Sequence, residues 1–489
     1  MEKYLIANRG LVATSFIKTL NRLNKNSFLI CSKEELDYYP PFISDNLILV
    51  DTHFTRYLED EDLLIKVLVN NGIEGFIPGY GFKSQNSLFA VKCKKNGIRF
   101  IGPKPEKLEI ASNKSKMKEI AALNFIPVVK GSTEIKNLDE LKKHVENLKF
   151  PIILKPVNGW GSHNIKLIKS KSLLEQGYNS FMKKMQAIKG YYQKTFLAEE
   201  FIEEIREIEI PYLADCKGNH YILEPIENTI QKNRKKIISV SPVPNISKKI
   251  INRINDYAEK LLKVMDIKGV GVIEFFIDNK DNIYFNEINP TLPFNFPLIE
   301  EKNRISLTEL LIDIFEGKEV KYPKPKDEIV MSINIVAEDV EVRETKGILD
   351  YFEFSPERNS YLLPVYRKGE KVSLLYDPLV GTMIVSGVSN DTIKKTGVAN
   401  LETLVISGIG TNINNLKSLL NSKKIFNEKT TIADSEEILK EEKSNLDKES
   451  VAMIAATIFH QQNRGKSFNE RSNFIEENLF DKITRKIFG

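Results

Sequence analysis

The chain lacks the features that mark secreted, membrane-spanning or nucleic-acid-binding proteins. It has only three cysteines in 489 residues, Cys31, Cys93 and Cys216. An odd number of scattered cysteines, without metal-binding spacing, argues against a disulfide framework and against a zinc site. No apolar run approaches the roughly 20 residues that a membrane-spanning helix needs. The formal net charge of +5 is small beside 71 basic and 66 acidic residues, so the sequence indicates no nucleic-acid-binding surface.

Length and the first residues narrow the class of protein further. A chain of 489 residues is too long for one hydrophobic core, so we expect three or four structural units, which favours a multidomain enzyme. The opening MEKYLIANRG carries charge at once and has no long apolar stretch of the kind a signal peptide needs. We therefore expect a cytoplasmic protein.

The first hundred residues alternate short β-rich runs with helical periodicity. The runs KYLIA, SFLIC and NLILV predict strands, and LVATSFIKTLNRL and EDLLIKVLVNN predict helices. This alternation is typical of a parallel sheet with helices on both faces. The glycines of PGYGF follow the next strand, where an open α/β sheet places its ligand crevice. A simple turn explains these glycines equally well.

The rest of the chain mixes helices with antiparallel-type strands. Residues 114–124 predict a helix, 150–168 a strand, glycine loop and second strand, and 195–295 mostly strands with a long helix near 247–265. Further short strands follow residue 327, and 413–422 predicts a helix. Residues 433–450 are highly charged and either helical or disordered. The apolar SVAMIAATIF that follows is suited either to a partner protein or to packing on its own chain.

The stretch YFNEINPTLPFNF carries the clearest chemistry. Glu287 and Asn289 end a predicted strand, and Glu274 lies on the preceding strand, which a short turn at Asp278–Asn282 joins to it. Antiparallel pairing would bring these three side chains together. Carboxylate and carboxamide oxygens suit Mg²⁺, whose coordination is completed by water and phosphate. Solvated rim charges are the alternative for such acids.

Two lysines precede this stretch in positions that suit phosphate binding. Lys155 ends a buried strand immediately before the glycine loop, and Lys114 begins a helix. Such lysines can neutralise phosphate oxygens while loop N–H groups bind them. Either lysine alone is more often a solvated surface group.

Several motifs taken in order resemble the ATP-grasp biotin carboxylases, the biotin carboxylase components of acetyl-CoA, propionyl-CoA and pyruvate carboxylases. The resemblance covers roughly residues 3–430 and keeps motif order and spacing, which is more specific than any one motif. The motifs are IANRG (6–10), PGYGFKSQN (78–86), IGPKPE (101–106), FPIILKP (150–156), AEEFI (198–202), EFF…NEIN (274–289), YDPLVGTMI (376–384) and GIGTNI (408–413).

The resemblance implies an α/β and α+β multidomain fold. It implies a Rossmann-like preATP-grasp domain at 1–112, a hinge helix and ATP-grasp lid at 113–202, an ATP-grasp body at 203–326, a biotin carboxylase C-terminal domain at 327–432, and a charged linker with terminal helices at 433–489. It also implies a ligase reaction in which ATP and bicarbonate give carboxyphosphate, whose CO₂ passes to biotin.

The same resemblance assigns residues to the nucleotide and the metal. Lys114 and Lys155 would hold the ATP phosphates together with the loop glycines Gly159 and Gly161. Glu199 and the main chain of Ile202 would bind adenine. The remaining assignments are Gln231 at the ribose, Lys236 as the catalytic residue on the γ-phosphate side, and Glu274, Glu287 and Asn289 as ligands of Mg²⁺ or Mn²⁺.

The acceptor half of the family's site is replaced in this sequence. Thr291 stands where the family has an arginine thought to stabilise the biotin enolate, and Asn295 where it has a glutamate thought to deprotonate bicarbonate. Asn334 takes the place of a second arginine, and Glu207 that of a histidine near the ribose. The lid loop reads Asn158-Gly159-Trp160-Gly161-Ser162 instead of a run of glycines. We interpret the apolar residues Phe294 and Phe296 as part of a remodelled acceptor pocket.

These observations support one leading hypothesis and two alternatives. The leading one is a biotin carboxylase-like ATP-grasp protein that binds MgATP and whose acceptor chemistry is altered or lost because these residues are replaced. The alternatives are a non-catalytic subunit of a biotin-dependent carboxylase-type complex and an ATP-grasp ligase acting on another carboxylate. The sequence contains no Met-Lys-Met biotin attachment motif, so biotin would be carried by a separate chain. We expect a homodimer or a subunit of a complex with biotin carrier and carboxyltransferase subunits.

Overall fold

The computed structural model describes most of the chain in two compact units, Met1–Ser435 and Glu436–Gly489. The described residues are 2–38, 46–51, 60–81, 83–158, 165–187, 195–232, 235–322, 324–338, 346–373, 377–426, 429–434 and 437–438. The predicted helical or disordered segment at 433–450 lies almost wholly outside these residues, as does SVAMIAATIF. In the described part, no helix has both the length and the apolar character that crossing a membrane requires.

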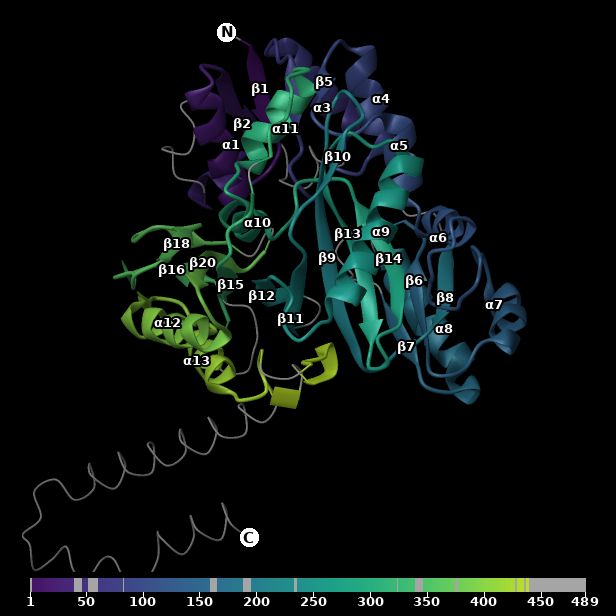
Figure 1. The fold of residues 1–489 in the computed structure, drawn as a ribbon. Helices are drawn as coiled ribbons and strands as arrows, with labels where there is room; N and C mark the ends of the chain where they lie inside the picture. Colours follow the sequence, from purple (N-terminus) through teal and green to yellow (C-terminus); the bar gives the residue numbers. More distant parts are fainter. Residues whose placement is uncertain are drawn as a thin grey trace, which may run out of the picture. The chain divides into compact units, whose positions relative to one another are not determined.

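The first unit begins with the predicted parallel sheet. Its five strands run in the order β3-β2-β1-β4-β5; Figure 1 labels β1, β2 and β5 of this sheet near the N-terminus. The strands are β1 (Lys3–Ile6), β2 (Asn26–Ser32), β3 (Leu47–Val50), β4 (Gly75–Ile77) and β5 (Arg99–Phe100). The helices are α1 (Gly10–Arg22), α3 (Glu61–Asn70), α4 (Ser87–Lys95) and α5 (Pro105–Ser112), with a 3₁₀ turn η1 (Lys33–Tyr38).

Alternation along β1 explains why helices cover both faces of this sheet. Tyr4 and Ile6 point into a core that contains α1, whereas Leu5 and Ala7 point into a second core that contains α3 and α4. Successive side chains of a strand face opposite sides, so a run that is apolar at every position needs cover on both. The sequence prediction of a doubly covered parallel sheet is confirmed.

The turn after β4 shows why PGYGF needs its first glycine. Gly79 has a φ of +66°, and a Cβ built on it would lie 2.6 Å from Val12 Cγ1 and 2.8 Å from Asn8 Nδ2. Asn8 Nδ2 donates to the carbonyls of Pro78 and Tyr80, at 2.8 Å each. Only glycine tolerates this backbone and this close approach, so a structural turn accounts for Gly79.

A smaller three-stranded sheet follows. The strand order is β7-β6-β8, with both pairings antiparallel. The two strands predicted before and after the glycine loop, β6 and β7, therefore pair as a hairpin. Its elements are α6 (Lys114–Leu123), α7 (Leu138–His144), η3 (Val145–Asn147), β6 (Ile152–Pro156), β7 (Lys166–Ile168), η4 (Lys171–Leu173), α8 (Leu174–Ala187) and β8 (Phe196–Glu200).

A nine-stranded sheet forms the largest layer. Its strands run β14-β13-β9-β11-β12-β15-β20-β18, and β10 pairs with β9, as the central strands of Figure 1 show. The strands are β9 (Ile205–Ala214), β10 (His220–Ile222), β11 (Ile226–Lys232), β12 (Lys235–Ser241), β13 (Gly269–Asp278), β14 (Ile283–Asn289), β15 (Ile329–Val336), β18 (Ser360–Pro364) and β20 (Leu379–Gly387). The associated helices are α9 (Lys248–Met265), α10 (Phe296–Asn303) and α11 (Leu307–Phe315).

This sheet crosses the boundary that the sequence places at residue 327. Strand β15 pairs with β12, with Ser241 opposite Val330, and also with β20. The segment from 327 onward therefore extends the preceding sheet. Its further elements are β16 (Gly347–Ile348), β17 (Tyr351–Glu353), β19 (Lys371–Val372), α12 (Asn390–Thr403), β21 (Val405–Ser407) and the predicted helix α13 (Ile413–Asn421).

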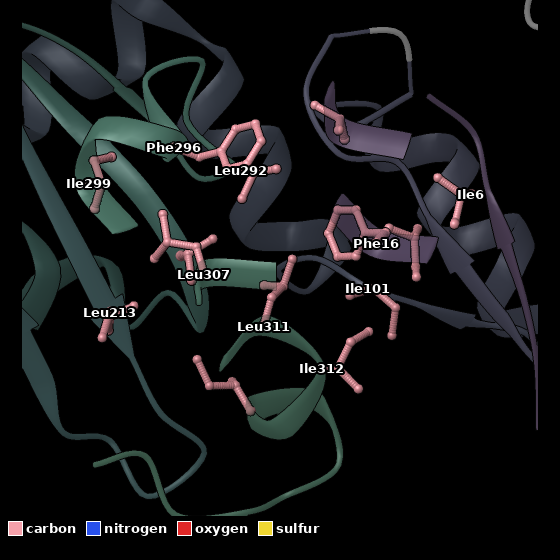
Figure 2. Packing of buried hydrophobic residues seen from close by; sticks show 14 of the residues in the cluster. Ile6, Phe16, Ile101, Leu213, Leu292, Phe296, Ile299, Leu307, Leu311 and Ile312 are labelled. Carbon is pink, nitrogen blue, oxygen red and sulfur yellow. The ribbon is translucent and has the colours of Figure 1, made fainter. Parts of the chain in front are cut away.

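The apolar residues after Asn289 belong to a hydrophobic core. Leu292 and Phe296 are 1% and 3% exposed and pack with α10, α11 and α1; Figure 2 shows both beside Ile299 and Leu307. Phe294 is half-buried, with its ring centroid 5.9 Å from that of Tyr80. Phe296 thus stabilises the packing of helices, which is not the pocket-lining role that the sequence suggested.

Candidate functional site

The hairpin β13–β14 brings Glu274, Glu287 and Asn289 together. Glu274 lies directly opposite Glu287. The amide nitrogen of Asn289 donates to Glu274 Oε1 at 3.2 Å and to Glu287 Oε1 at 3.0 Å. The predicted turn is present, since the amide of Asp278 donates to the carbonyl of Asn282. Two carboxylates and a carboxamide within hydrogen-bonding distance form a donor set that suits a hard divalent cation.

A β-bulge adjusts the register of this hairpin. Glu274 faces Glu287 whereas Phe275 faces Phe285, so Asn286 is the extra residue on β14. Its amide nitrogen donates to Glu274 Oε2 at 3.2 Å. Bulges commonly re-aim side chains beside functional sites. Here the bulge keeps Phe275 and Phe285 in the core while Glu287 and Asn289 reach Glu274.

The carboxylates continue across the sheet onto β9. Glu209 lies opposite Glu274, and Glu207, two residues earlier, shares its face. Single carboxylate oxygens of Glu207, Glu209 and Glu274 all lie within 4.8 Å of one another. Sequence reasoning missed Glu209, although the alternation of REIEIPYL places Glu207 and Glu209 on one face of the strand.

Lys236 lies among these acids. Its ammonium pairs with Glu209 and lies 3.8 Å from Glu274 Oε1. Burial alone would lower the pKa of Lys236, but Glu209, Glu274 and Glu207 together raise it above its ordinary value. Lys236 is therefore a fixed positive charge at neutral pH.

The two hairpin acids titrate in opposite directions. Burial and the neighbouring Glu287 raise the pKa of Glu274 well above its ordinary value. Burial also acts to raise the pKa of Glu287, but the ammonium of Lys114 outweighs it and the pKa falls to about 2. Lys114 Nζ lies 2.6 Å from Glu287 Oε2. A cation between the two acids would relieve the repulsion that keeps Glu274 from ionising.

Lys114 reaches this position because α6 begins there. Asn113 caps the helix by accepting from the backbone N–H of Lys116 at 2.9 Å. The backbone N–H of Lys114 donates to the carbonyl of Val157 at 3.1 Å, just beyond β6. The helix start is thus tied to the strand that carries Lys155.

Lys155 and Glu199 form a buried ion pair. They lie on the neighbouring strands β6 and β8, are 4% and 2% exposed, and approach to 2.6 Å between Nζ and Oε2. Lys118 of α6, which sequence reasoning missed, pairs with the other oxygen, Oε1. Burial raises the pKa of Glu199, but the two ammonium groups outweigh it and hold the pKa at about 2. Burial lowers the pKa of Lys118 to about 7.

Of the other residues predicted to bind the nucleotide, the structure describes Gln231 and Ile202. Gln231 is buried on β11, directly opposite Lys236 on β12. Ile202 is half-buried, two residues beyond β8. Gly159 and Gly161 lie outside the described residues, as do Trp160 and Ser162.

Asn295 and Asn334, two of the positions that the sequence analysis assigns to an altered acceptor site, are neutral, and their side chains are hydrogen-bonded inside the protein. Asn295 Nδ2 donates to Asn228 Oδ1 at 2.8 Å and to Glu209 Oε2 at 3.2 Å. Asn334 Nδ2 donates to the carbonyl of Lys236 at 2.9 Å, and its Oδ1 accepts from Thr382 at 2.7 Å. Both asparagines are 2% exposed. Thr291 lines a small cavity with Gly79 and Leu292.

Three models of known protein families match successive parts of the chain. Residues 1–108 match the biotin carboxylase N-terminal domain. Residues 112–322 match the ATP-binding domain of the carbamoyl-phosphate synthase L chain. Residues 333–434 match the biotin carboxylase C-terminal domain.

Individual relatives agree with this division. A biotin carboxylase of Halalkalibacterium halodurans is 30% identical over 432 residues, which cover 86% of this chain and 94% of that one. The mitochondrial methylcrotonoyl-CoA carboxylase subunit alpha of Rattus norvegicus is 28% identical, and the match covers 85% of this chain but only 59% of that longer protein. The crystal structure of a biotin carboxylase β,γ-ATP complex from Campylobacter jejuni is 25% identical, with a TM-score of 0.82 over 88% of this chain and 97% of that one.

Proposed function

Because the chain belongs to the biotin carboxylase family, we propose that it binds MgATP at the hairpin β13–β14. In this proposal Glu274, Glu287 and Asn289 hold the cation, and Lys114 and Lys155 bind phosphate oxygens. The single observation that carries the proposal is the close approach of Asn289 to both carboxylates, with Lys114 against Glu287. Magnesium would neutralise the phosphates and keep several waters. The related Campylobacter jejuni protein, which forms the β,γ-ATP complex, supports the same ligand here.

The base and ribose would lie beyond the phosphates. Glu199 and the main chain of Ile202 would bind adenine, Gln231 would face the ribose, and Gly159 and Gly161 would cover the phosphates. Manganese would occupy the same oxygen donors as magnesium, because both prefer hard ligands. The division into domains at 112, 202, 326 and 432 remains part of this proposal.

The family reaction is the carboxylation of biotin with ATP and bicarbonate, and we propose that this chain has lost nearly all of that activity. A bound bicarbonate needs a positive partner or it stays in water. Thr291, Asn295 and Asn334 carry no charge, and the two asparagines already use their amides internally. Losing one stabiliser of developing charge costs about 3–4 kcal/mol, and losing a general base costs about 10²–10⁴ in rate.

In the proposed function Lys236 is the catalytic residue. Its ammonium would approach the γ-phosphate, where it could stabilise charge that develops on transfer. Its pairing with Glu209 fixes its position. An ATP-grasp ligase acting on a different carboxylate would use the same lysine.

The internal hydrogen bonds of Asn295 and Asn334 favour a second candidate function. A non-catalytic subunit would need these two positions only for stability, and buried neutral side chains with their hydrogen bonds made inside the protein meet that need. Such a subunit would occupy a carboxylase-like place in a complex with biotin carrier and carboxyltransferase subunits, with biotin on the separate carrier. The rat relative, named as a carboxylase subunit, supports membership of a complex, and a homodimer is the simplest self-assembly.

Thermal unfolding with nucleotide tests the binding proposal. MgATP should raise the Tm of the full chain, because a ligand at 100 times its Kd stabilises by about 2.7 kcal/mol. Glu287→Gln should abolish most of this rise. The matched control is Glu109→Gln, which changes a 65% exposed carboxylate and should leave the rise intact. No shift in the wild-type chain at millimolar MgATP would overturn the binding proposal and leave the non-catalytic subunit.

A further inference from the structure

We propose that Gln85 is a positioning residue for the divalent cation, and that it acts through the carboxamide of Asn289. The proposal rests on the proposed function, because it concerns the same cation. It starts from one contact between distant parts of the chain: Gln85 Nε2 donates to Asn289 Oδ1 at 2.9 Å.

The backbone around Gln85 is firmly held, so its side chain can act as a support. The N–H of Ser84 donates to the carbonyl of Gly81 at 2.9 Å, and the N–H of Asn86 to the carbonyl of Lys83 at 3.1 Å. Asn86 also caps α4 by accepting from Phe89 N at 2.8 Å, and its amide donates to Glu61 at 2.7 Å. A group mounted on such a turn can orient a neighbour with little loss of its own freedom.

In the structure the amide of Asn289 is oriented away from metal binding. Its single oxygen accepts from Gln85, and its nitrogen donates to Glu274 and Glu287. A magnesium or manganese ion binds oxygen and cannot be bound by an amide NH₂. The amide of Asn289 therefore has to turn by half a revolution to present Oδ1 to a cation that bridges the two acids.

Glutamine at position 85 can follow this rotation. Once Asn289 has turned, its NH₂ faces Gln85 and needs an acceptor. The amide of Gln85 carries both a donor and an acceptor, so its own half-turn replaces the original hydrogen bond with a reversed one. The pair keeps one hydrogen bond in each state, and the cation-ready state is held by Oε1 of Gln85.

The test is Mn²⁺ binding to the full chain in the presence of ADP, followed by electron paramagnetic resonance. Gln85→Leu removes the support and should weaken Mn²⁺ binding by about 10-fold or more, as loss of a group that orients a metal ligand commonly does. Gln85→Glu supplies only an acceptor, so it should favour the turned Asn289 and bind Mn²⁺ at least as tightly as the wild type.

A double-mutant comparison separates this mechanism from a general effect on folding. In an Asn289→Ala background Gln85→Leu should have no further effect, because the group through which it acts is gone. Equal Mn²⁺ affinity for Gln85→Leu and the wild type would overturn the inference. It would also be overturned if Gln85→Leu lowered the Mn²⁺ affinity as much in the Asn289→Ala background as in the wild type. If wild-type chain with ADP binds no Mn²⁺, both the proposed metal site and the role of Gln85 fail. If it binds Mn²⁺ and Gln85→Leu is silent, only the role of Gln85 fails.

Discussion

At the scale of single residues, burial decides how the charged groups of the candidate site behave. Glu274 and Glu207 have raised pKa values chiefly because they are buried, whereas ammonium groups overcome burial at Glu287 and Glu199. Neighbouring acids therefore differ in ionisation although they share one sheet. The sheet tolerates like charges directly opposite one another, otherwise destabilising, because Lys236 and Lys114 are inserted among them.

Glu300 offers a residue-scale prediction away from this site. Burial raises its pKa to about 7, and hydrogen bonds from the backbone N–H groups of Leu307 and Thr308 only partly oppose this; Leu307 N donates to Glu300 Oε1 at 2.6 Å. The unfolded chain keeps the ordinary pKa of 4.5. Ionising Glu300 therefore costs more free energy in the folded state than in the unfolded state. The free energy of unfolding should fall as the pH rises from 4.5 to 7.

Glu300→Gln should remove this pH dependence while keeping an oxygen for Leu307. We expect the variant and the wild type to have similar Tm values near pH 4.5, and the variant to be more stable at pH 8 by on the order of 2 kcal/mol. Scanning calorimetry at the two pH values measures the difference. A Tm difference that does not change with pH would contradict the assigned cause.

Some site residues could be found from the sequence and others could not. Glu274, Glu287 and Asn289 were predictable, because two strands and a short turn determine their neighbours locally. Lys118 and Gln85 were not, because their partners Glu199 and Asn289 are 81 and 204 residues away in the chain. Lys118 and Gln85 reach the candidate site only because α6 and the turn before α4 pack against it.

At the scale of elements, α6 ends in a turn that its sequence fits poorly. The N–H of Ile126 donates to the carbonyl of Ala121 at 2.9 Å and that of Phe125 to Ala122 at 3.0 Å, the hydrogen bonds of a Schellman cap. Phe125 holds the left-handed position with a φ of +59° and is 88% exposed. Glycine normally occupies this position, since a side chain there costs about 1–2 kcal/mol.

Phe125→Gly should therefore stabilise the chain. The substitution relieves the left-handed strain and gives up little apolar burial, so we expect a gain of about 1 kcal/mol, offset in part by the extra freedom of glycine in the unfolded chain. The comparison variant Phe125→Ala keeps the strain and should show no gain. A Tm for Phe125→Gly at or below that of Phe125→Ala would show that the left-handed backbone is not costly here.

The secondary structure could be predicted better from the sequence than the order in which the strands pair. The strands and helices of the first hundred residues, the hairpin β13–β14 and the helices α6, α9 and α13 follow from periodicity and turn residues. The order of strands in the large sheet does not. The pairing of β12 with β15, across about ninety residues that include α9, β13, β14, α10 and α11, depends on tertiary contacts that no local pattern records.

At the scale of the whole molecule, the proposed site draws on several elements around the hairpin β13–β14. In our proposal its nucleotide half consists of the acids of β13 and β14 with Lys114 of α6, Lys155 of β6 and Lys236 of β12. The proposed acceptor half contains Asn295, which donates to Glu209 of β9, and Asn334 of β15, which donates to the backbone carbonyl of Lys236. We propose that the first half keeps its charged groups while the second has lost them, so that nucleotide binding and carboxyl transfer separate in this chain.

Phosphate release from ATP measures that separation. The full chain is assayed with Mg²⁺, with and without bicarbonate and free biotin, at an ATP concentration that raises its Tm, beside the Halalkalibacterium halodurans biotin carboxylase as a positive control. We expect little phosphate release, with no increase when bicarbonate and biotin are added together. Bicarbonate-dependent release that rises with biotin to the level of the control would contradict the loss of the acceptor half.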